Sequence, residues 1–239
     1  MQHPETLVLA PGLLCDSIVW EKQAAALADR WPLQIADHGL ADSLPRMAEL
    51  ILDTAPPVFA LAGHSMGGRV ALEVLRRAPG RVARLALLDT GFEPLPHGEA
   101  GERERAGRLR LLEIAGREGM LAMGRQWAHN MVHPARLTDT ILMDAIHQMI
   151  ARAPLAQFQA QIHALLQRPD CTALLATIRV PTLLLCGRQD SWSPLARHVD
   201  MAQRIAGSQL VDVPDCGHMS TMEQPGAVTS ALRAWLQQQ

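Results

Sequence analysis

The chain lacks several features that would place it in common protein classes. Its 239 residues include 22 Lys and Arg against 24 Asp and Glu, without a basic block, which argues against a nucleic-acid partner. The apolar runs are too short and interrupted to span a bilayer. The N-terminus has no basic stretch followed by a long apolar one, so we expect no signal peptide. These absences favour a cytoplasmic protein without a membrane partner.

Metal-binding and disulfide patterns are also lacking. The four cysteines, Cys15, Cys171, Cys186 and Cys216, have no CxxC spacing. In a chain of this length they do not resemble a disulfide framework, so we expect reduced thiols. No HExxH or Cys/His ligand spacing occurs either, and we therefore predict neither a metal nor another cofactor. We interpret the histidines of the middle region as surface or pocket-lining residues: His129, His133, His147 and His163.

What the chain does contain is an alternation of short apolar runs with amphipathic stretches. The apolar runs are continuous, which is typical of strands buried on both faces of a parallel sheet. The pattern predicts an α/β fold with a mostly parallel central sheet and helices on both faces. The expected strands are 6–12, 33–37, 57–64, 83–90, 181–190 and a strand with its loop at 208–218; the expected helices are 16–30, 42–55, 66–77, 194–206 and 224–237.

The alternation is interrupted between about residues 91 and 170. This stretch begins with a loop rich in Pro, Gly and Glu and contains no convincing strand. An all-helical block between two parallel strands is expected to lie over the carboxyl edge of the sheet, where open α/β sheets bind ligands. We therefore expect a core of residues 1–92 and 171–239, with a helical cap, 93–170, inserted after the strand 83–90. Helical patterns within the cap lie near 106–118, 119–132, 138–152 and 154–168.

The sequence "GHSMGG" (63–68) joins one predicted strand to one predicted helix. Glycines two residues before and two after Ser65 would permit a tight turn that lifts the serine hydroxyl clear of the sheet. A helix N-terminus below the serine would also favour a developing negative charge. A glycine-rich turn in which Ser65 only caps the helix is the structural alternative. We favour Ser65 as a nucleophile.

A nucleophilic serine needs a base, and the base needs an acid to orient it. His218 follows the predicted strand 208–213 and is our candidate base. Asp190 follows the strand "TLLLCG" and is our candidate acid. Asp89, at the end of "LALLD", is the main alternative acid, and Asp215 a weaker one because it is too close to the histidine in sequence. Asp89 is otherwise expected to anchor its loop through backbone N–H groups.

Together these stretches resemble the α/β-hydrolase superfamily, in particular its small capped carboxylesterases, enol-lactonases and carbon–carbon bond hydrolases. The resemblance rests on "APGLLCDSIVW", "GHSMGG", "LLLCGRQDSWSP" and "DCGHMSTMEQP". It implies an oxyanion hole formed by the backbone N–H groups of Leu13 and Met66. Pro11 stands where relatives usually have histidine, which affects the outer hydrogen bonds of that loop.

The resemblance implies a serine hydrolase acting on a small ester, thioester or lactone. The same three residues would also suit a carbon–carbon hydrolase, a lyase, a perhydrolase or haloperoxidase-like enzyme, or a non-catalytic ligand-binding member of the fold. We expect a small acyl substrate and a monomer or homodimer. Met123, Trp127 and Met131 are our candidates for the substrate pocket. His64 is expected to pack under the turn, and Cys15 to be either an inert thiol or a reactive pocket residue.

Overall fold

A single six-stranded sheet forms the centre of the computed structural model, which describes residues 5–238. Every neighbouring pair of strands is parallel, so the predicted parallel sheet is confirmed. Several strands are shorter than the predicted ranges, which include loop residues at their ends, such as Pro11 after β1 and Pro57 before β3. The strands are β1 (Thr6–Ala10), β2 (Leu33–Ile35), β3 (Phe59–His64), β4 (Val82–Leu88), β5 (Thr182–Gly187) and β6 (Gln209–Val213).

The strand order, β2-β1-β3-β4-β5-β6, reverses direction beside β1. The chain first moves outward from β1 to β2 and then returns to the other side of β1 with β3. The connections after β1 and β3 therefore diverge, and they leave a crevice at the carboxyl ends of these two strands, where open α/β sheets place their ligands. Leu13 follows β1 and Ser65 follows β3, so both lie at this crevice.

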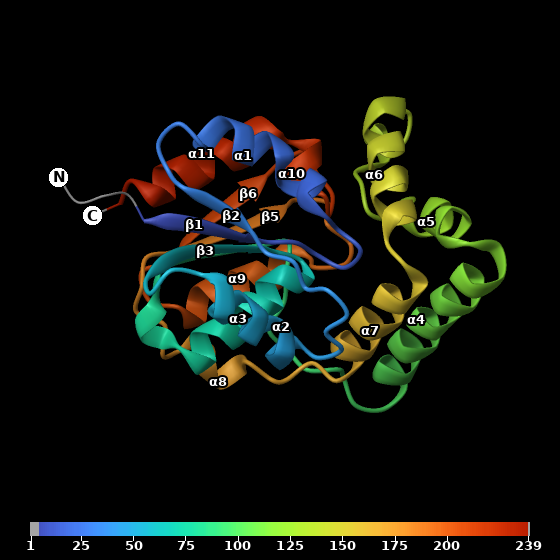
Figure 1. Cartoon of the computed structure of the whole chain (residues 1–239), viewed down its shortest axis with the longest axis horizontal. Helices are drawn as coiled ribbons and strands as arrows, with labels where there is room; N and C mark the ends of the chain where they lie inside the picture. Colours follow the sequence, from blue (N-terminus) through green and yellow to red (C-terminus); the bar gives the residue numbers. More distant parts are fainter. Residues whose placement is uncertain (1–4, 239) are drawn as a thin grey trace.

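Helices cover both faces of the sheet, as the apolar strands require. Helices α1 and α11 lie on one face, and α2, α3 and α9 on the other (Figure 1). The predicted helix 16–30 is instead a 3-10 turn, Ser17–Trp20, followed by a shorter α1; Asp16 caps the turn by accepting from the Ile18 N–H. The helices are α1 (Glu21–Leu27), α2 (Leu44–Thr54), α3 (Met66–Arg77), α8 (Thr172–Leu175), α9 (Leu195–Arg204), α10 (Ser220–Glu223) and α11 (Pro225–Leu236).

Four helices between β4 and β5 form a helical lobe, which the strands approach with their carboxyl ends (Figure 1). Its first helix begins at Glu99 and is longer than predicted, because Glu–Arg pairs one turn apart, such as Glu99–Arg103, stabilise the stretch expected to be a loop. Among residues 5–238, no helix has both the length and the apolarity needed to cross a bilayer. The lobe helices are α4 (Glu99–Glu118), α5 (Met120–Ala128), α6 (Thr140–Arg152) and α7 (Leu155–Leu166).

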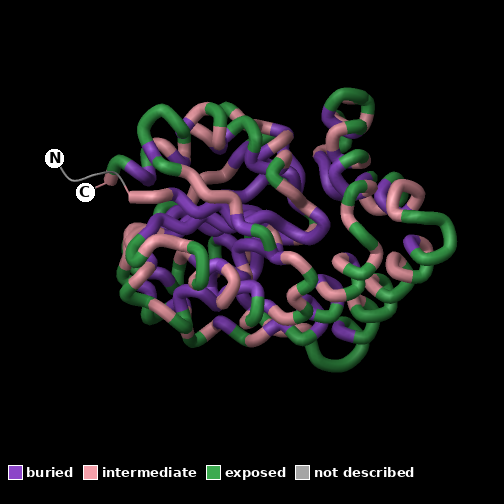
Figure 2. The backbone as a smooth tube through the Cα atoms, in the orientation of Figure 1, coloured by how far each residue is buried: buried purple, intermediate pink, exposed green. Residues whose placement is uncertain are grey.

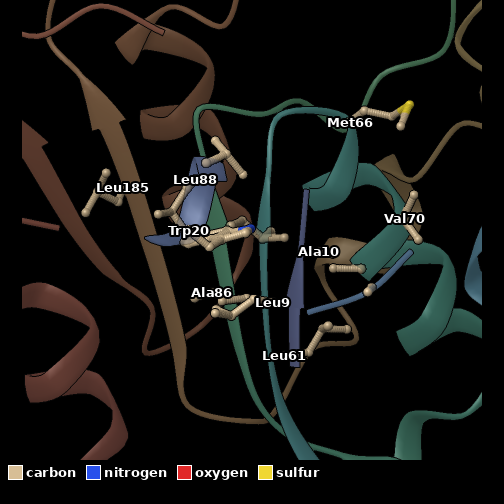
Figure 3. Packing of buried hydrophobic residues seen from close by; sticks show 14 of the residues in the cluster. Leu9, Ala10, Trp20, Leu61, Met66, Val70, Ala86, Leu88 and Leu185 are labelled. Atoms are coloured by element: carbon tan, nitrogen blue, oxygen red, sulfur yellow. The ribbon is translucent and has the colours of Figure 1, made fainter. Parts of the chain in front are cut away.

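The core lies between the sheet and its flanking helices, and the inner strands β3 and β5 are buried along their whole length (Figure 2). Leu9 and Leu185 lie on the face of the sheet that Trp20 covers, and Leu61 lies on the opposite face, which Val70 of α3 covers (Figure 3). All five side chains are fully buried. Burial of such side chains contributes roughly 1.5–3 kcal/mol each, which makes the sheet a rigid base for the loops at its edge.

Candidate active site

Ser65 occupies a strained turn between β3 and α3. Its φ of 54° and ψ of −117° are unfavourable for any residue with a side chain. The turn fits only because its neighbours lack side chains: a Cβ on Gly63 would lie 2.3 Å from the Gly67 carbonyl oxygen, and one on Gly67 would lie 2.1 Å from the Ala10 carbonyl oxygen. The two glycines are therefore required sterically, as the sequence predicted. Thr90 adds support by donating from its hydroxyl to the Ser65 carbonyl oxygen at 2.6 Å.

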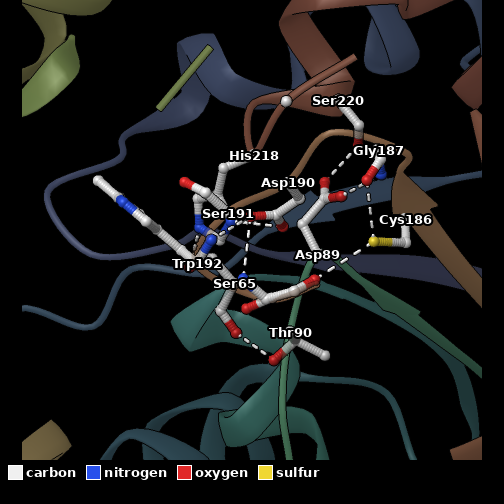
Figure 4. A network of polar contacts seen from close by, with 12 residues as sticks. Ser65, Asp89, Thr90, Cys186, Gly187, Asp190, Ser191, Trp192, His218 and Ser220 are labelled. Carbon is white, nitrogen blue, oxygen red and sulfur yellow. Dashed lines mark hydrogen bonds and ion pairs between the residues drawn. The ribbon is translucent and has the colours of Figure 1, made fainter. Parts of the chain in front are cut away.

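The structure brings Ser65, His218 and Asp190 into one hydrogen-bonded line (Figure 4). His218 Nε2 is 2.8 Å from Ser65 Oγ, and His218 Nδ1 is 2.8 Å from Asp190 Oδ2. The other carboxylate oxygen of Asp190 accepts from the backbone N–H groups of Trp192 and Ser193, at 2.8 and 2.9 Å. These bonds fix the carboxylate, so the ring has a defined orientation toward the serine.

Electrostatics in this line favour a histidine that is easily protonated. Burial lowers the pKa of His218, but the Asp190 carboxylate and its hydrogen bond raise it by more, so the pKa lies above the ordinary value of 6.5. Burial raises the pKa of Asp190, yet His218 and the two backbone N–H groups hold it below 3.8. Asp190 is therefore a carboxylate at neutral pH, able to stabilise an imidazolium.

Asp89, the alternative acid, lies beside this line without bonding to His218. Its carboxylate accepts from the Gly187 N–H at 2.9 Å and from the Ser220 hydroxyl. Complete burial and the nearby Asp190 charge raise its pKa to about 8, so it is largely protonated at neutral pH. Asp89 thus anchors the end of β5 through one backbone N–H, rather than its own loop as expected. Asp215 is exposed on its turn.

Several supports of the histidine loop were missed by the sequence analysis. The buried Glu223 carboxylate accepts from the backbone N–H groups of Gly217 and Met219, on either side of His218. The backbone N–H of His218 donates to the Met131 carbonyl oxygen at 2.7 Å, which joins the loop to the helical lobe. The sequence signal that could have identified Glu223 is weak: it is an acidic residue in the short helix directly after the loop.

His64 also serves this loop. Its Nε2 lies 2.8 Å from the His218 carbonyl oxygen, and its side chain is fully buried. Burial and the neighbouring His218 lower the pKa of His64 to about 4, so its ring is neutral at neutral pH and donates to that carbonyl. These contacts agree with the expectation that His64 packs beneath the turn instead of transferring protons.

Leu13 and Met66, whose backbone N–H groups are the predicted oxyanion hole, both line the cavity together with Ser65. Met66 is the first residue of α3, so its N–H has no carbonyl partner within the helix. The Leu13 loop is held by its neighbours: the Leu14 N–H donates to Gln161 Oε1 of α7 at 2.9 Å, and His38 Nε2 is 3.1 Å from the Pro11 carbonyl oxygen. His38 therefore ties down the loop in which Pro11 replaces the usual histidine.

A cavity of about 540 Å³ adjoins Ser65, between the sheet edge and the helical lobe. Trp127 and Met131 line it, as the sequence predicted, and Trp192 stacks on Trp127 with ring centroids 5.2 Å apart. Met123 does not line the cavity, because its side chain is fully buried in the packing of α5. The prediction for Met123 is therefore wrong: the helical stripe containing it continues from the cavity wall into the interior of the lobe.

Two further predictions concern cysteines and metals. Cys15 lines the cavity, but burial raises the pKa of its thiol to about 12, which supports the interpretation of an inert thiol. Within residues 5–238, one group has ligand atoms close enough to share a metal: Asp89, Cys186 and Asp190. Their carboxylate oxygens already accept hydrogen bonds, and burial raises the pKa of the Cys186 thiol, so the group suits a proton-sharing network better than a metal.

Comparisons with known proteins agree with this fold. The family model described as "Alpha/beta hydrolase family" matches residues 7–231. Pimeloyl-[acyl-carrier protein] methyl ester esterase of Nitrosomonas europaea is 26% identical over 254 residues, which cover 95% of this chain and 94% of the esterase. A thermophilic esterase from Thermogutta terrifontis, solved with malate bound, is 30% identical with a TM-score of 0.85, covering 97% of this chain and 89% of the esterase chain.

The enol-lactonase of Burkholderia xenovorans LB400 has a TM-score of 0.84 at 21% identity, covering 99% of this chain and 93% of the lactonase chain. At this identity the likeness concerns the fold alone. It extends over nearly the whole chain, including the helical lobe.

Proposed function

Because the chain belongs to the alpha/beta hydrolase family, we propose that it is a serine hydrolase that cleaves a small carboxylic ester, thioester or lactone through an acyl-enzyme on Ser65. The observation that carries the proposal is the line of two 2.8 Å contacts from Asp190 through His218 to Ser65, which ends at a cavity. A serine that only capped a helix would need neither the strained turn nor the histidine.

The first half of the reaction acylates the serine. His218 Nε2 accepts the Ser65 proton as Oγ attacks the substrate carbonyl, and the imidazolium is stabilised by the Asp190 carboxylate. The Leu13 and Met66 N–H groups donate to the oxyanion of the tetrahedral intermediate. Loss of one such donor typically raises the barrier by about 3 kcal/mol. His218 then gives its proton to the departing alkoxide or thiolate, and the acyl group remains on Ser65.

The second half returns the enzyme to its starting state. A water molecule takes the place of the leaving group, and His218 removes its proton as the oxygen attacks the acyl carbon. Collapse of the second tetrahedral intermediate breaks the bond to Ser65 Oγ, which regains a proton from His218. The carboxylic acid product is released. Each step uses the same two N–H donors, so one rigid geometry serves both halves.

Two relatives support an ester as the bond that is cleaved. Both the Nitrosomonas europaea and the Thermogutta terrifontis proteins are described as esterases, and each matches nearly all of this chain. A protein of Caulobacter vibrioides described as "Putative carbamate hydrolase RutD" is similar to the chain to the same degree, at 27% identity over 98% of it. The cavity is lined in part by Trp127, Met131 and Met149, which offer an apolar surface for an acyl chain. A small ester is therefore the substrate class that the apolar cavity and the two esterases favour together.

A substrate panel tests this proposal. Purified enzyme would be assayed on p-nitrophenyl esters of increasing acyl length, on lactones and on a thioester, together with Ser65→Ala and with Ser230→Ala as the control. Ser230 is exposed on α11 and is not among the residues that line the cavity. We expect hydrolysis of at least one class by the wild type and by Ser230→Ala, and nearly none by Ser65→Ala. Turnover of a β-diketone, with no hydrolysis of any ester, would instead favour carbon–carbon cleavage.

A further inference from the structure

Five arginine side chains line the same cavity as Ser65. Arg69 comes from α3, Arg103 and Arg108 from α4 and Arg197 from α9, while Arg168 follows the end of α7. These segments are remote in sequence and meet where the helical lobe faces the sheet. Because guanidinium groups stay protonated, this wall of the cavity has a fixed positive charge unless carboxylates balance it.

Carboxylates balance only part of that charge. Glu104 is shared by two of the arginines, with its Oε1 2.7 Å from Arg168 Nη1 and 2.8 Å from Arg108 Nη2. Arg197 pairs with the half-exposed Glu93, at 3.3 Å. Among the residues the structure describes, Arg69 forms no ion pair; its Nη1 donates to the Glu93 carbonyl oxygen at 2.8 Å. Arg103 pairs with the exposed Glu99 at 3.2 Å, so five cations face three carboxylates and positive charge is in excess. The excess is greatest at Arg69, which has no ion pair among the described residues, and beside it at Arg197, whose partner Glu93 is itself half-exposed.

Arg69 and Arg197 also lie close to each other, on either side of Gly91. A Cβ added to Gly91 would be 2.7 Å from Arg69 Nη2 and 2.9 Å from Arg197 Cδ, so the absence of a side chain there makes room for both arginines. Burial, together with the charges of Arg168 and Arg197, lowers the pKa of Arg69 to about 9. Two like charges held together in a partly buried position are unfavourable unless an anion binds between them.

We propose that this pair, Arg69 with Arg197, binds a carboxylate carried by the substrate, so that the enzyme acts on esters whose acyl part ends in a second, ionised acid group. This inference rests on the proposed hydrolysis at Ser65. Ser65, Arg69 and Arg197 line one cavity of about 540 Å³. The proposed substrate therefore has a short chain of a few carbon atoms between the reacting carbonyl and the carboxylate.

The kinetic test compares two substrates that differ only in charge. Monomethyl glutarate has a terminal carboxylate, and its monoamide methyl ester has a neutral carboxamide of the same shape; a pH-stat measures the hydrolysis of both. We expect the wild type to have a higher kcat/KM for the acid. In Arg69→Met and in Arg197→Met, the ratio of kcat/KM for the acid to kcat/KM for the amide should fall roughly 10- to 100-fold. This is the usual effect of losing one charge-assisted hydrogen bond.

Arg117→Met is the matched control, because Arg117 is an exposed arginine of α4 that pairs only with Glu113. Its substrate ratio should equal that of the wild type. An unchanged ratio in both cavity variants would overturn the proposal. If Arg69→Met does not fold, Arg197→Met and the charge-conserving Arg69→Lys still provide the comparison, and the lysine variant should retain part of the preference. Stronger competitive inhibition by inorganic phosphate than by glutarate would contradict the assignment to a carboxylate.

A binding measurement separates this inference from the proposed reaction. Ser65→Ala would be titrated calorimetrically with monomethyl glutarate, alone and in combination with Arg69→Met. Binding that is lost on adding Arg69→Met supports the carboxylate site even if the wild type hydrolyses no ester, an outcome that would refute only the proposed reaction. Equal affinity of the two proteins for the acid and its amide, alongside normal ester hydrolysis by the wild type, would refute only the carboxylate site.

Discussion

The two walls of the cavity, one formed by the sheet edge and one by the helical lobe, are held in different ways. At the sheet edge, Ser65, His218 and Asp190 each follow a parallel strand, and short contacts to the backbone fix the loops that carry them. At the lobe, long side chains such as Arg168 and Glu104 form ion pairs across segments distant in sequence. The first arrangement is suited to positioning reacting atoms, and the second to selecting what binds beside them.

The two sides of the cavity also differ in what is unfavourable about them: backbone strain at Ser65, and like charges at the arginines. The sheet edge tolerates an unfavourable backbone at Ser65 because the buried strands below it cannot rearrange cheaply. The excess of positive charge, which a ligand can relieve, instead lies where the core faces the lobe, at Arg69 of α3 and Arg197 of α9. We therefore expect substitutions at the sheet edge to change the rate of reaction, substitutions of these two arginines to change substrate preference, and substitutions in the ion pairs of the lobe to change stability.

The largest expected effect is loss of the nucleophile or the base. Ser65→Ala and His218→Ala should each lower kcat on the order of 10⁶-fold, and the double variant should be little worse, because the two groups act as a unit. Steady-state assays on the best ester of the panel, with circular dichroism to verify folding, provide the measurement. A folded Ser65→Ala protein that kept more than a tenth of the activity would refute the assignment of the nucleophile.

The two buried aspartates sharpen the comparison within the sheet edge. Asp190→Asn should lower kcat on the order of 10⁴-fold, because an amide favours the wrong tautomer of His218. Asp89→Asn should lower kcat by less than about tenfold. Asp89 is already largely protonated, and an amide oxygen can still accept from the Gly187 N–H. The two variants are isosteric controls for each other. The reverse ranking, in folded proteins, would move the acid to Asp89.

The pH dependence reports the state of the base. Because His218 must be neutral to accept the serine proton and its pKa is raised by Asp190, kcat/KM should fall on acidification, with a midpoint above pH 6.5. Asp190→Asn removes the negative charge that raises the pKa of His218, so the midpoint of the residual activity should move to lower pH. A profile that is flat from pH 5 to 8 while the protein remains folded would argue against a histidine base.

A smaller effect is expected at the lobe wall. Glu104→Gln removes the carboxylate shared by Arg108 and Arg168, and should lower the free energy of unfolding at pH 7 by about 1–3 kcal/mol. These partners lower the pKa of Glu104 from 4.5 to about 2, so the stabilisation is complete above pH 4.5 and is lost as the pH falls toward 2. The difference from the wild type in urea unfolding should therefore shrink in acid.

The control for that variant is Glu102→Gln, an exposed glutamate of the same helix. It should unfold like the wild type at every pH. Equal losses in the two variants would show that helix α4 responds to acidic residues in general and not to the shared ion pair.

Much of the sheet edge could be predicted from the sequence, because its signals are local. A continuous apolar run, the glycines around Ser65 and the single polar residues after later strands each depend on a few adjacent positions. Helix α3 (Met66–Arg77) has the predicted bounds for this reason. The contact between Asp190 and His218 follows from parallel strands ending at one edge.

The lobe wall could not be predicted in the same way. Which arginine meets Glu104 depends on how α4 and the end of α7 pack, and no short stretch encodes that distance. Met123 was placed in the pocket because helical spacing gives a face but not the point where the face leaves the cavity. The early start of α4 was missed because its glycines, and the prolines just before it, resemble a loop, whereas its Glu–Arg pairs stabilise a helix.

The covalent state of Ser65 tests the account most directly. Wild-type enzyme, Ser65→Ala and Ser230→Ala would be incubated with a fluorophosphonate, and their intact masses measured, followed by peptide mapping. We predict one phosphonyl group per chain on the peptide containing Ser65 in the wild type and in Ser230→Ala, and none in Ser65→Ala. An unmodified wild-type protein, or a label that persists in Ser65→Ala, would contradict a nucleophilic serine at this turn.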